Sequence, residues 1–283
     1  MPELPEVETV RRGLEDRLKN FYVQHIEVLS ERTISSIGGI SVFSESIRGS
    51  ILGNWTRRGK YLICFLKSQN NEAHTGWLVV HLRMTGQFKW LNSTQSPCSH
   101  TRVRFWNSIG NEIRFVDTRN FGQMWWVSPE HTPREEINGL MKLGPEPFSN
   151  EFNPLYLKKS LSTRKRSIKA SLLDQTVVAG AGNIYADESL FEAGIIPTKE
   201  SRDLSEIEIT RLCNSLVRVL KISIGKGGTT FKDFRDLEGI NGNYGGQAWV
   251  YRRSGKGCRK CGEKILREKI CGRSTHWCPN CQR

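Results

Sequence analysis

Four cysteines near the end of the 283-residue chain constrain its fold more than any other feature. They form two C-x2-C pairs separated by sixteen residues: Cys258, Cys261, Cys278 and Cys281. Two such pairs can close a tetrahedral thiolate shell around zinc, and eight cysteines in a chain of intracellular character favour metal over disulfides. The pattern therefore predicts a module held by one structural zinc ion, Zn(2+). Cys271 is interpreted as a free or packed thiol, and Cys64 as a core residue.

Charge is distributed unevenly along the chain. The net charge is +13, from 42 Lys and Arg against 29 Asp and Glu. Residues 1–150 carry 18 basic and 15 acidic side chains, a net of +3, whereas residues 151–283 carry 24 and 14, a net of +10. A basic half predicts contact with a polyanion, although a solvated basic surface explains charge alone. No apolar run reaches the roughly 18 residues that span a bilayer, so we expect no membrane partner.

Hydrophobic periodicity predicts a helix followed by a β-rich region. After Pro5, apolar residues recur at helical spacing and give one buried stripe: Val7, Val10, Leu14 and Leu18. Short runs with alternating polarity follow, at roughly 22–29, 61–66, 77–83, 102–106, 112–117 and 123–127. Alternation of this kind is typical of strands with one buried face, so we expect a sandwich or a barrel.

Composition places the remaining boundaries. We expect a β domain over 1–128 and a linker over 129–150, where Pro, Glu, Asn and Gly are frequent. A helical domain is expected over 151–246, and its best-defined helix begins at Ser205, which makes a capping box with Glu208. The cysteine module then occupies 247–283.

Seven short motifs occur in a fixed order along the chain. They are Met1-Pro-Glu-Leu-Pro-Glu-Val-Glu-Thr-Val, Arg57-Arg-Gly-Lys60-Tyr-Leu, His81-Leu-Arg-Met84-Thr-Gly, Asp117-Thr-Arg119-Asn-Phe121-Gly, Leu143-Gly-Pro-Glu-Pro, Gly180-Ala-Gly-Asn183-Ile-Tyr-Ala and Gly228-Thr-Thr. With the four cysteines they span nearly the whole chain. Together they resemble the motifs of the formamidopyrimidine-DNA glycosylase family.

The resemblance implies both a fold and an activity. The fold is an α+β multidomain one: an N-terminal β-sandwich with an N-terminal helix, a helix–two-turn–helix domain and a C-terminal β-hairpin zinc finger. The activity is that of a bifunctional DNA glycosylase and AP (apurinic or apyrimidinic site) lyase of base excision repair. Such an enzyme excises oxidised purines (8-oxoguanine, formamidopyrimidines) through an N-terminal proline Schiff base and nicks the strand by β,δ-elimination. The implied partner is damaged double-stranded DNA, bound by a monomer.

The chemical properties of the first residues are suited to this reaction. Removal of Met1 exposes a secondary amine on Pro2, and the reference pKa of an α-amino group, about 8, leaves a usable neutral fraction at physiological pH. Attack on C1′ of the deoxyribose displaces the base and leaves an iminium, which acidifies the C2′ proton. Glu3 is the candidate general acid/base, whereas Glu6 either orients the site or caps the helix.

An extruded base leaves a void in the duplex, and the unstacking costs on the order of a few kcal/mol. Met84, Arg119 and Phe121 resemble the family's void-filling residues; the alternative places Met84 and Phe121 in the core. The commoner family motif reads Asp-Pro-Arg-Arg-Phe-Gly, so Thr118 and Asn120 are departures. We expect them to alter one phosphate contact or the stiffness of the loop.

The remaining site residues are implied by the resemblance. Lys60 matches a catalytic-pocket lysine that contacts a phosphate near the lesion, and the alternative is a solvated strand-edge lysine. Lys169, Asn183 and His100 are implied DNA contacts. Arg273 is implied as both a catalytic and a DNA-binding residue at the tip of the hairpin.

Other interpretations fit parts of the sequence. The sister endonuclease VIII type prefers oxidised pyrimidines, but Leu4 and the void-filling residues favour the purine type. A non-enzymatic zinc-finger protein that binds nucleic acid explains the charge and the cysteines, yet it leaves Pro2, Glu3 and Lys60 without a role. The glycine-rich stretch 225–246 resembles a loop that closes over the flipped base. The opening residues do not resemble a signal or transit peptide, so we expect a cytoplasmic, nucleoid-associated protein.

Overall fold

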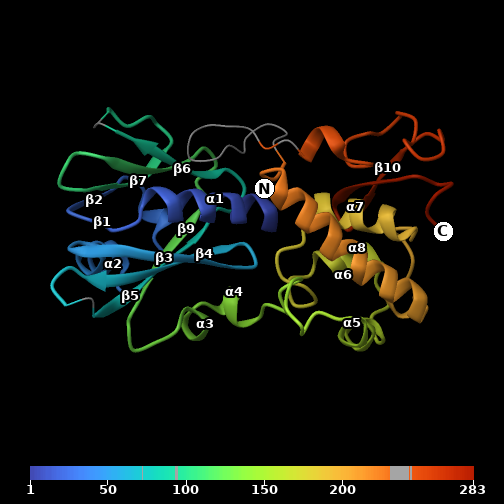
Figure 1. The fold of residues 1–283 in the computed structure, drawn as a ribbon, viewed down its shortest axis with the longest axis horizontal. Coiled ribbons are helices and arrows are strands. Elements are labelled where there is room, and N and C mark those ends of the chain that lie inside the picture. The colour runs from blue at the N-terminus through green and yellow to red at the C-terminus, as the bar shows by residue number, and fades with distance from the viewer. Residues whose placement is uncertain (72, 93–94, 230–241, 243) are drawn as a thin grey trace. The chain divides into compact units, whose positions relative to one another are not determined.

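The computed structural model describes residues 1–71, 73–92, 95–229, 242 and 244–283 (Figure 1). Most of the predicted loop over 225–246 therefore lies outside the described residues. The chain divides into two compact units. The N-terminal unit comprises Met1–Met141 and Gly227–Gly242, and the C-terminal unit comprises Lys142–Lys226 and Asn243–Arg283.

Two antiparallel sheets form the body of the N-terminal unit. The five-stranded sheet has the order β1 (Phe21–Tyr22), β3 (Ser50–Arg58), β4 (Tyr61–Ser68), β5 (His74–His81), β9 (Gln123–Val127). The four-stranded sheet has the order β2 (His25–Val28), β7 (Thr101–Trp106), β8 (Glu112–Asp117), β6 (Gly86–Leu91). Side chains of both sheets meet in one apolar core, which confirms the predicted sandwich.

The N-terminal helix α1 (Leu4–Arg17) closes this core. Pro5 lies in its first turn, as expected, and the predicted stripe of Val7, Val10 and Leu14 is buried. Burial of apolar side chains stabilises by about 1.5–3 kcal/mol each, so α1 is held firmly against the sheets. Four shorter elements complete the unit: the 3-10 turn η1 (Glu31–Thr33) and the helices α2 (Gly39–Ile47), α3 (Pro133–Glu136) and α4 (Asn138–Met141).

Helices and a hairpin build the C-terminal unit. Its elements are α5 (Pro154–Leu161), α6 (Ile168–Leu173), α7 (Asn183–Ala193), η2 (Ser201–Asp203), α8 (Glu206–Gly225), η3 (Tyr244–Gln247), β10 (Leu266–Ile270) and β11 (Arg273–Trp277). The predicted capping box is confirmed, because Ser205 and Glu208 bond reciprocally at the start of α8. No described helix is long and apolar enough to cross a membrane.

The sequence patterns found some elements and missed others. The six predicted strands correspond to β2, β4, β5, β7, β8 and β9, with ends shifted by up to about three residues, and Cys64 is fully buried as predicted. Strands β3 and β6 and helix α2 were not predicted. In β3 a bulge between Leu52 and Trp55 shifts the register and breaks the alternation of polarity along the strand.

Candidate active site

The N-terminus of α1 is buried and fixed by two carboxylates. Pro2 is buried, and Glu3, the N-cap residue, is only 3% exposed. Glu3 and Glu6 form a capping box in which the Glu3 backbone N–H donates to Glu6 Oε2 at 2.8 Å. Of the two roles expected for Glu6, capping the helix is therefore present, and it also fixes the backbone next to Pro2.

The second oxygen of Glu6 holds a distant segment of the same unit. Glu6 Oε1 accepts a hydrogen bond of 2.7 Å from the backbone N–H of Thr229. The preceding Gly228 adopts φ +77°, and a Cβ there would lie 2.9 Å from Glu6 Oε1 and 3.3 Å from Glu6 Cα. A side chain at position 228 would push this segment off the start of α1, so glycine is needed both for its conformation and for the close approach.

Lys60 and His81 are both buried, and the charge of Lys60 acts on His81. Lys60 is 5% exposed, so the alternative of a solvated strand-edge lysine is wrong. Burial and the charges of Arg83 and Lys60 lower the pKa of His81 to about 3. Its Nδ1 accepts a 3.0 Å hydrogen bond from the Arg83 backbone N–H, and its ring packs edge-on against Tyr61. His81 is therefore neutral at pH 7 and carries its proton on Nε2.

The loop after β8 is organised by one fully buried carboxylate. Asp117 Oδ2 accepts from the backbone N–H groups of Phe121 at 2.8 Å and Gly122 at 2.7 Å. Asp117 Oδ1 accepts from the Arg119 backbone N–H at 3.2 Å and from the hydroxyl of Thr85. Charge-assisted bonds of this kind are stronger than neutral ones, so the positions of the Arg119 and Phe121 backbones are set before any ligand binds.

Asn120 ties the same loop to a second segment. It adopts a left-handed backbone conformation (φ +53°), which asparagine tolerates better than most residues. Its Oδ1 accepts from Ser30 Oγ at 3.0 Å and from Thr33 Oγ1 at 3.3 Å, at the two sides of η1. The expected change in loop stiffness thus has a structural basis, because the asparagine cross-links two loops.

Phe121 projects from this loop into solvent. It is 39% exposed, so the alternative that placed it in the core is wrong. The guanidinium carbon of Arg119 lies 4.9 Å, and that of Arg32 5.3 Å, from the centre of its ring. Each such contact is worth about 0.5–1 kcal/mol at an exposed site. The phenyl ring is held by two cations and its carboxylate-anchored backbone.

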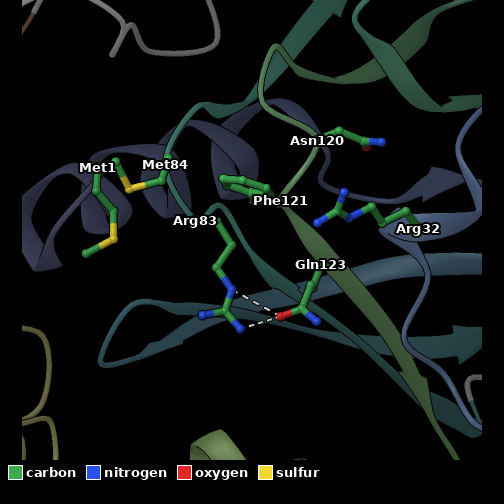
Figure 2. Close-up of a pocket in the computed structure, with 7 residues that line it drawn as sticks. All are labelled: Met1, Arg32, Arg83, Met84, Asn120, Phe121 and Gln123. Carbon is green, nitrogen blue, oxygen red and sulfur yellow. Dashed lines mark hydrogen bonds between the residues drawn. The ribbon is translucent and has the colours of Figure 1, made fainter.

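A hollow of about 430 Å³ opens beside Phe121 (Figure 2). It is lined by Met1, Arg32, Arg83, Met84, Asn120, Phe121 and Gln123, with no acidic side chain among these seven. Arg83 Nε donates to Gln123 Oε1 at 3.0 Å across one wall. The first residue of the chain therefore lies at the same hollow as two of the three predicted void-filling residues, Met84 and Phe121.

In the C-terminal unit, Lys169 lies inside rather than on the surface. Its ammonium is fully buried, 2.6 Å from Asp187 Oδ1, and it donates to Thr275 Oγ1 at 2.8 Å and to the Ser274 carbonyl at 3.0 Å. Asp187 Oδ2 in turn accepts from the His276 backbone N–H at 2.9 Å. As folded here, Lys169 fixes β11, and a phosphate contact would require these bonds to open. Its implied DNA contact stays a prediction.

A second carboxylate of α7 holds the start of the cysteine module. Glu188 is buried, and its oxygens accept from the backbone N–H groups of Trp249 at 2.7 Å and of Val250 and Tyr251 at 2.9 Å each. Burial raises the pKa of Glu188. Asp187 and Glu188 are adjacent on α7. Through them this helix binds the backbone of the cysteine module both at its start and in β11.

The other predicted DNA-binding residues occupy different positions in the two units. Asn183 begins α7 and donates from Nδ2 to the Ser274 carbonyl at 2.9 Å. Arg273 is exposed at the start of β11, next to the hairpin turn. His100 is exposed in the N-terminal unit, and its carbonyl accepts from the Asp117 N–H at 2.9 Å. These positions do not test the predicted contacts, which stay predictions.

The four predicted ligands form a cluster suited to zinc. The sulfur atoms of Cys258, Cys261, Cys278 and Cys281 all lie within 4.8 Å of one another. The Cys258–Cys281 and Cys261–Cys278 sulfurs are 3.9 and 3.5 Å apart. A tetrahedron with Zn–S bonds of about 2.3 Å has edges of about 3.8 Å, so this cage has the right size. Cys271 lies outside the cluster and is exposed.

Comparisons with known proteins agree with these features. Two family models match: the formamidopyrimidine-DNA glycosylase N-terminal domain over residues 1–124, and the formamidopyrimidine-DNA glycosylase H2TH domain over residues 143–235. A curated formamidopyrimidine-DNA glycosylase of Prochlorococcus marinus is 68% identical over 283 residues, covering the whole of both chains. The chain belongs to the formamidopyrimidine-DNA glycosylase family.

Solved structures of the family have the same fold. A Lactococcus lactis Fpg mutant bound to Fapy-dG-containing DNA is 33% identical, with a TM-score of 0.90 and full coverage of both chains. A MutM structure in complex with carbocyclic 8-oxo-G-containing DNA is 34% identical, also with a TM-score of 0.90 and full coverage. The predicted fold class is thus confirmed: a β-sandwich, a helical domain and a cysteine-bearing hairpin.

Sequence reasoning missed several residues that build the site of this glycosylase. Asp117, Asp187 and Glu188 stand within or beside motifs that were recognised, yet no role was assigned to them. A carboxylate that directly follows two apolar residues at the end of a buried strand, as in Phe115-Val-Asp117, was the available signal for Asp117. Arg32 lies outside all of the motifs and carried no signal.

Loss of one ligand should remove zinc from the cysteine cluster. We expect Cys278→Ser to lower the zinc content from one ion per chain to near zero, because three thiolates leave the shell incomplete. Cys271→Ser is the matched control and should retain one ion. Elemental analysis of the purified variants measures both. Full zinc content in Cys278→Ser would show that this cluster is not the metal site.

His81 should make the N-terminal unit sensitive to mild acid. The unfolded chain protonates His81 near its ordinary pKa of about 6.5, whereas the folded protein resists protonation down to about 3, so stability falls as pH drops through this window. Between pH 7 and 5 this group should cost about 2 kcal/mol of unfolding free energy. Urea titrations followed by Trp fluorescence report mainly on this unit, which holds six of the eight Trp residues.

A variant comparison isolates the contribution of His81. His81→Gln should lose about 2 kcal/mol less than the parent protein over the same change of pH. His25→Gln, at an exposed position on β2, should behave like the parent. An identical pH dependence in His81→Gln and the parent would contradict the assignment of a neutral, buried His81.

Proposed function

We propose that this chain is a bifunctional DNA glycosylase and AP lyase that removes oxidised purines during base excision repair. One observation carries the proposal: the start of the chain shares a hollow with Met84 and Phe121, so a nucleophile and a wedge belong to one site. Relatives solved with Fapy-dG and with 8-oxo-G DNA support oxidised purines as substrates.

Pro2 is the proposed nucleophile once Met1 has been removed. Its free secondary amine attacks C1′ of the lesion nucleotide, the C1′–N bond breaks, and the base leaves with its electron pair and a proton. The amine nitrogen then loses its proton and the C1′–O4′ bond breaks as O4′ takes up a proton, which opens the sugar ring and leaves an iminium at C1′. The iminium draws electrons from the sugar, so a proton is lost from C2′ and the 3′ phosphate leaves by β-elimination. A second, δ-elimination releases the 5′ phosphate. The capping box supports this role because it fixes the residue next to Pro2.

Glu3 and Lys60 are the proposed partners of this amine. Glu3 moves protons at the sugar during ring opening and elimination, and its burial at the N-cap supports a fixed position for its carboxylate. Lys60 supplies a positive charge to a phosphate near the lesion. Lys60 is 5% exposed and its neighbour His81 is neutral, which supports a buried ammonium that does not share its charge with a protonated histidine.

The remaining predicted residues are proposed to bind damaged double-stranded DNA. Met84, Arg119 and Phe121 fill the void left by the extruded base, and the pre-set loop around Asp117 supports this role. His100, Lys169, Asn183 and Arg273 are proposed to contact the DNA, with Arg273 also assisting catalysis. One structural zinc ion is proposed to hold the hairpin that carries Arg273 and supplies no chemistry to the reaction.

The organisation of the chain is also part of the proposal. We propose domains over 1–128, 151–246 and 247–283, joined by a linker over 129–150. The protein acts as a monomer, and its DNA substrate places it in the cytoplasm at the nucleoid.

Replacement of the nucleophile tests the proposal directly. With Met1 removed, borohydride should trap the protein covalently on duplex DNA that carries 8-oxoguanine, because the iminium is reduced to a stable amine. Pro2→Gly should bind the same duplex but be trapped far less. Pro129→Gly, the same substitution at an exposed site, is the matched control and should be trapped like the parent. Equal trapping of Pro2→Gly and the parent would show that Pro2 is not the nucleophile.

A comparison of lesions tests the substrate class. Duplexes with 8-oxoguanine or a formamidopyrimidine should be cleaved faster than a duplex of the same sequence with thymine glycol. Preferential cleavage at thymine glycol would assign the chain to oxidised pyrimidines instead.

A further inference from the structure

Arg32 stands beside the void-filling residues although no sequence motif contains it. It belongs to η1, more than eighty residues before Phe121, and its guanidinium carbon lies 5.3 Å from the centre of the Phe121 ring. Figure 2 shows its side chain reaching across the hollow toward Phe121. The guanidinium of Arg119 lies at a similar distance, 4.9 Å, from the same ring. The guanidinium groups of Arg32 and Arg119 therefore both lie against the exposed Phe121 ring.

The position of Arg32 is fixed by its neighbours. Ser30 and Thr33, on either side of it, both donate hydrogen bonds to Asn120 Oδ1, at 3.0 and 3.3 Å. Thr33 is fully buried. Since Asn120 immediately precedes Phe121, these two bonds link η1 to the Phe121 loop. The backbone that carries Arg32 is thus anchored to the wedge.

The guanidinium itself is available for a ligand. Arg32 is exposed, and in the described part of the chain its guanidinium has the Phe121 ring but no carboxylate as a partner. The hollow that it lines with Arg83 contains two carboxamides and no acidic group among its seven lining residues. An arginine with free N–H donors, on an anchored backbone, at a hollow with no acidic lining residue, is suited to bind a phosphate.

We propose that Arg32 is a further DNA-contacting residue, which binds a backbone phosphate beside the void that Phe121 fills. The inference rests on the proposed function, since it requires that Phe121 enters the duplex. When the Phe121 ring inserts into the duplex, bases stack on its faces. The Arg32 guanidinium then leaves the ring and binds a neighbouring phosphate instead. Arg32 thereby adds affinity at the lesion without touching the reacting atoms.

The salt dependence of binding tests this role. The probe is a duplex with a tetrahydrofuran analogue of the abasic site, which cannot undergo the reaction. For the parent protein log Kd rises with log[salt], and loss of one phosphate contact should lower that slope by about 0.9 and weaken binding roughly eightfold at 0.1 M salt. We expect this for Arg32→Ala, whereas Arg32→Lys, which keeps the charge, should retain most of the slope.

Matched variants separate a phosphate contact from a general effect of charge or of stability. Arg48→Ala removes the same charge from an exposed position after α2, outside the hollow, and should leave the slope close to that of the parent. The proposal is overturned if Arg32→Ala and Arg48→Ala have the same slope, or if Arg32→Ala lowers only the unfolding free energy. It is also overturned if the loss of affinity depends on the base opposite the analogue while the slope is unchanged, since Arg32 would then contact a base.

Failure of the role proposed for Arg32 can be distinguished from failure of the proposed function. If the parent protein neither binds the abasic-site duplex nor cleaves 8-oxoguanine DNA, the function is wrong. If the parent does both and Arg32→Ala matches Arg48→Ala, only the role of Arg32 is wrong. Single-turnover cleavage at saturating enzyme should proceed in Arg32→Ala at the parent rate, because the residue acts on binding and not on the chemical step.

Discussion

The carboxylate of Glu6 holds together the part of the molecule on which the proposed chemistry depends. One oxygen fixes the backbone of Glu3 and the other fixes the backbone of Thr229, so a single buried side chain sets the start of α1 and a segment more than two hundred residues away. Because Pro2 directly precedes this anchored turn, the position of its nitrogen is restricted. Removal of Met1 would give a terminal amine, normally the most mobile group of a chain, the fixed geometry that the proposed nucleophile needs.

The same device recurs elsewhere in the protein. Asp117 accepts from three backbone N–H groups of the loop that presents Arg119 and Phe121, and Glu188 accepts from three at the start of the cysteine module. Asp187 pairs with Lys169 and with the backbone of β11. Each buried carboxylate satisfies several donors at once, so it fixes the segment that supplies them. Two of the segments fixed in this way, the loop after β8 and strand β11, carry proposed DNA contacts.

The sequence allowed most of the architecture to be predicted, but only part of the site. Periodicity identified α1 and six strands, and the cysteine spacing identified the cluster, because these signals are local. It missed β3, whose bulge breaks the alternation, and β6, which begins at Gly86 directly after a turn. The roles of Asp187 and Glu188 were invisible, since acidic residues on a helix are usually solvated, and the backbone groups that they bind lie about sixty to ninety residues away. Arg32 was missed for the same reason: its contact with the Phe121 ring, and the bond from its neighbour Ser30 to Asn120, each join segments about ninety positions apart.

The site of covalent attachment is the most direct test of this account. Protein trapped on 8-oxoguanine DNA with borohydride can be digested, and the modified peptide sequenced by tandem mass spectrometry. The account predicts that the sugar remnant is attached to the nitrogen of Pro2, on a peptide that begins at Pro2 with Met1 absent. Attachment to a lysine side chain such as that of Lys60, or efficient trapping by a chain that still carries Met1, would contradict it.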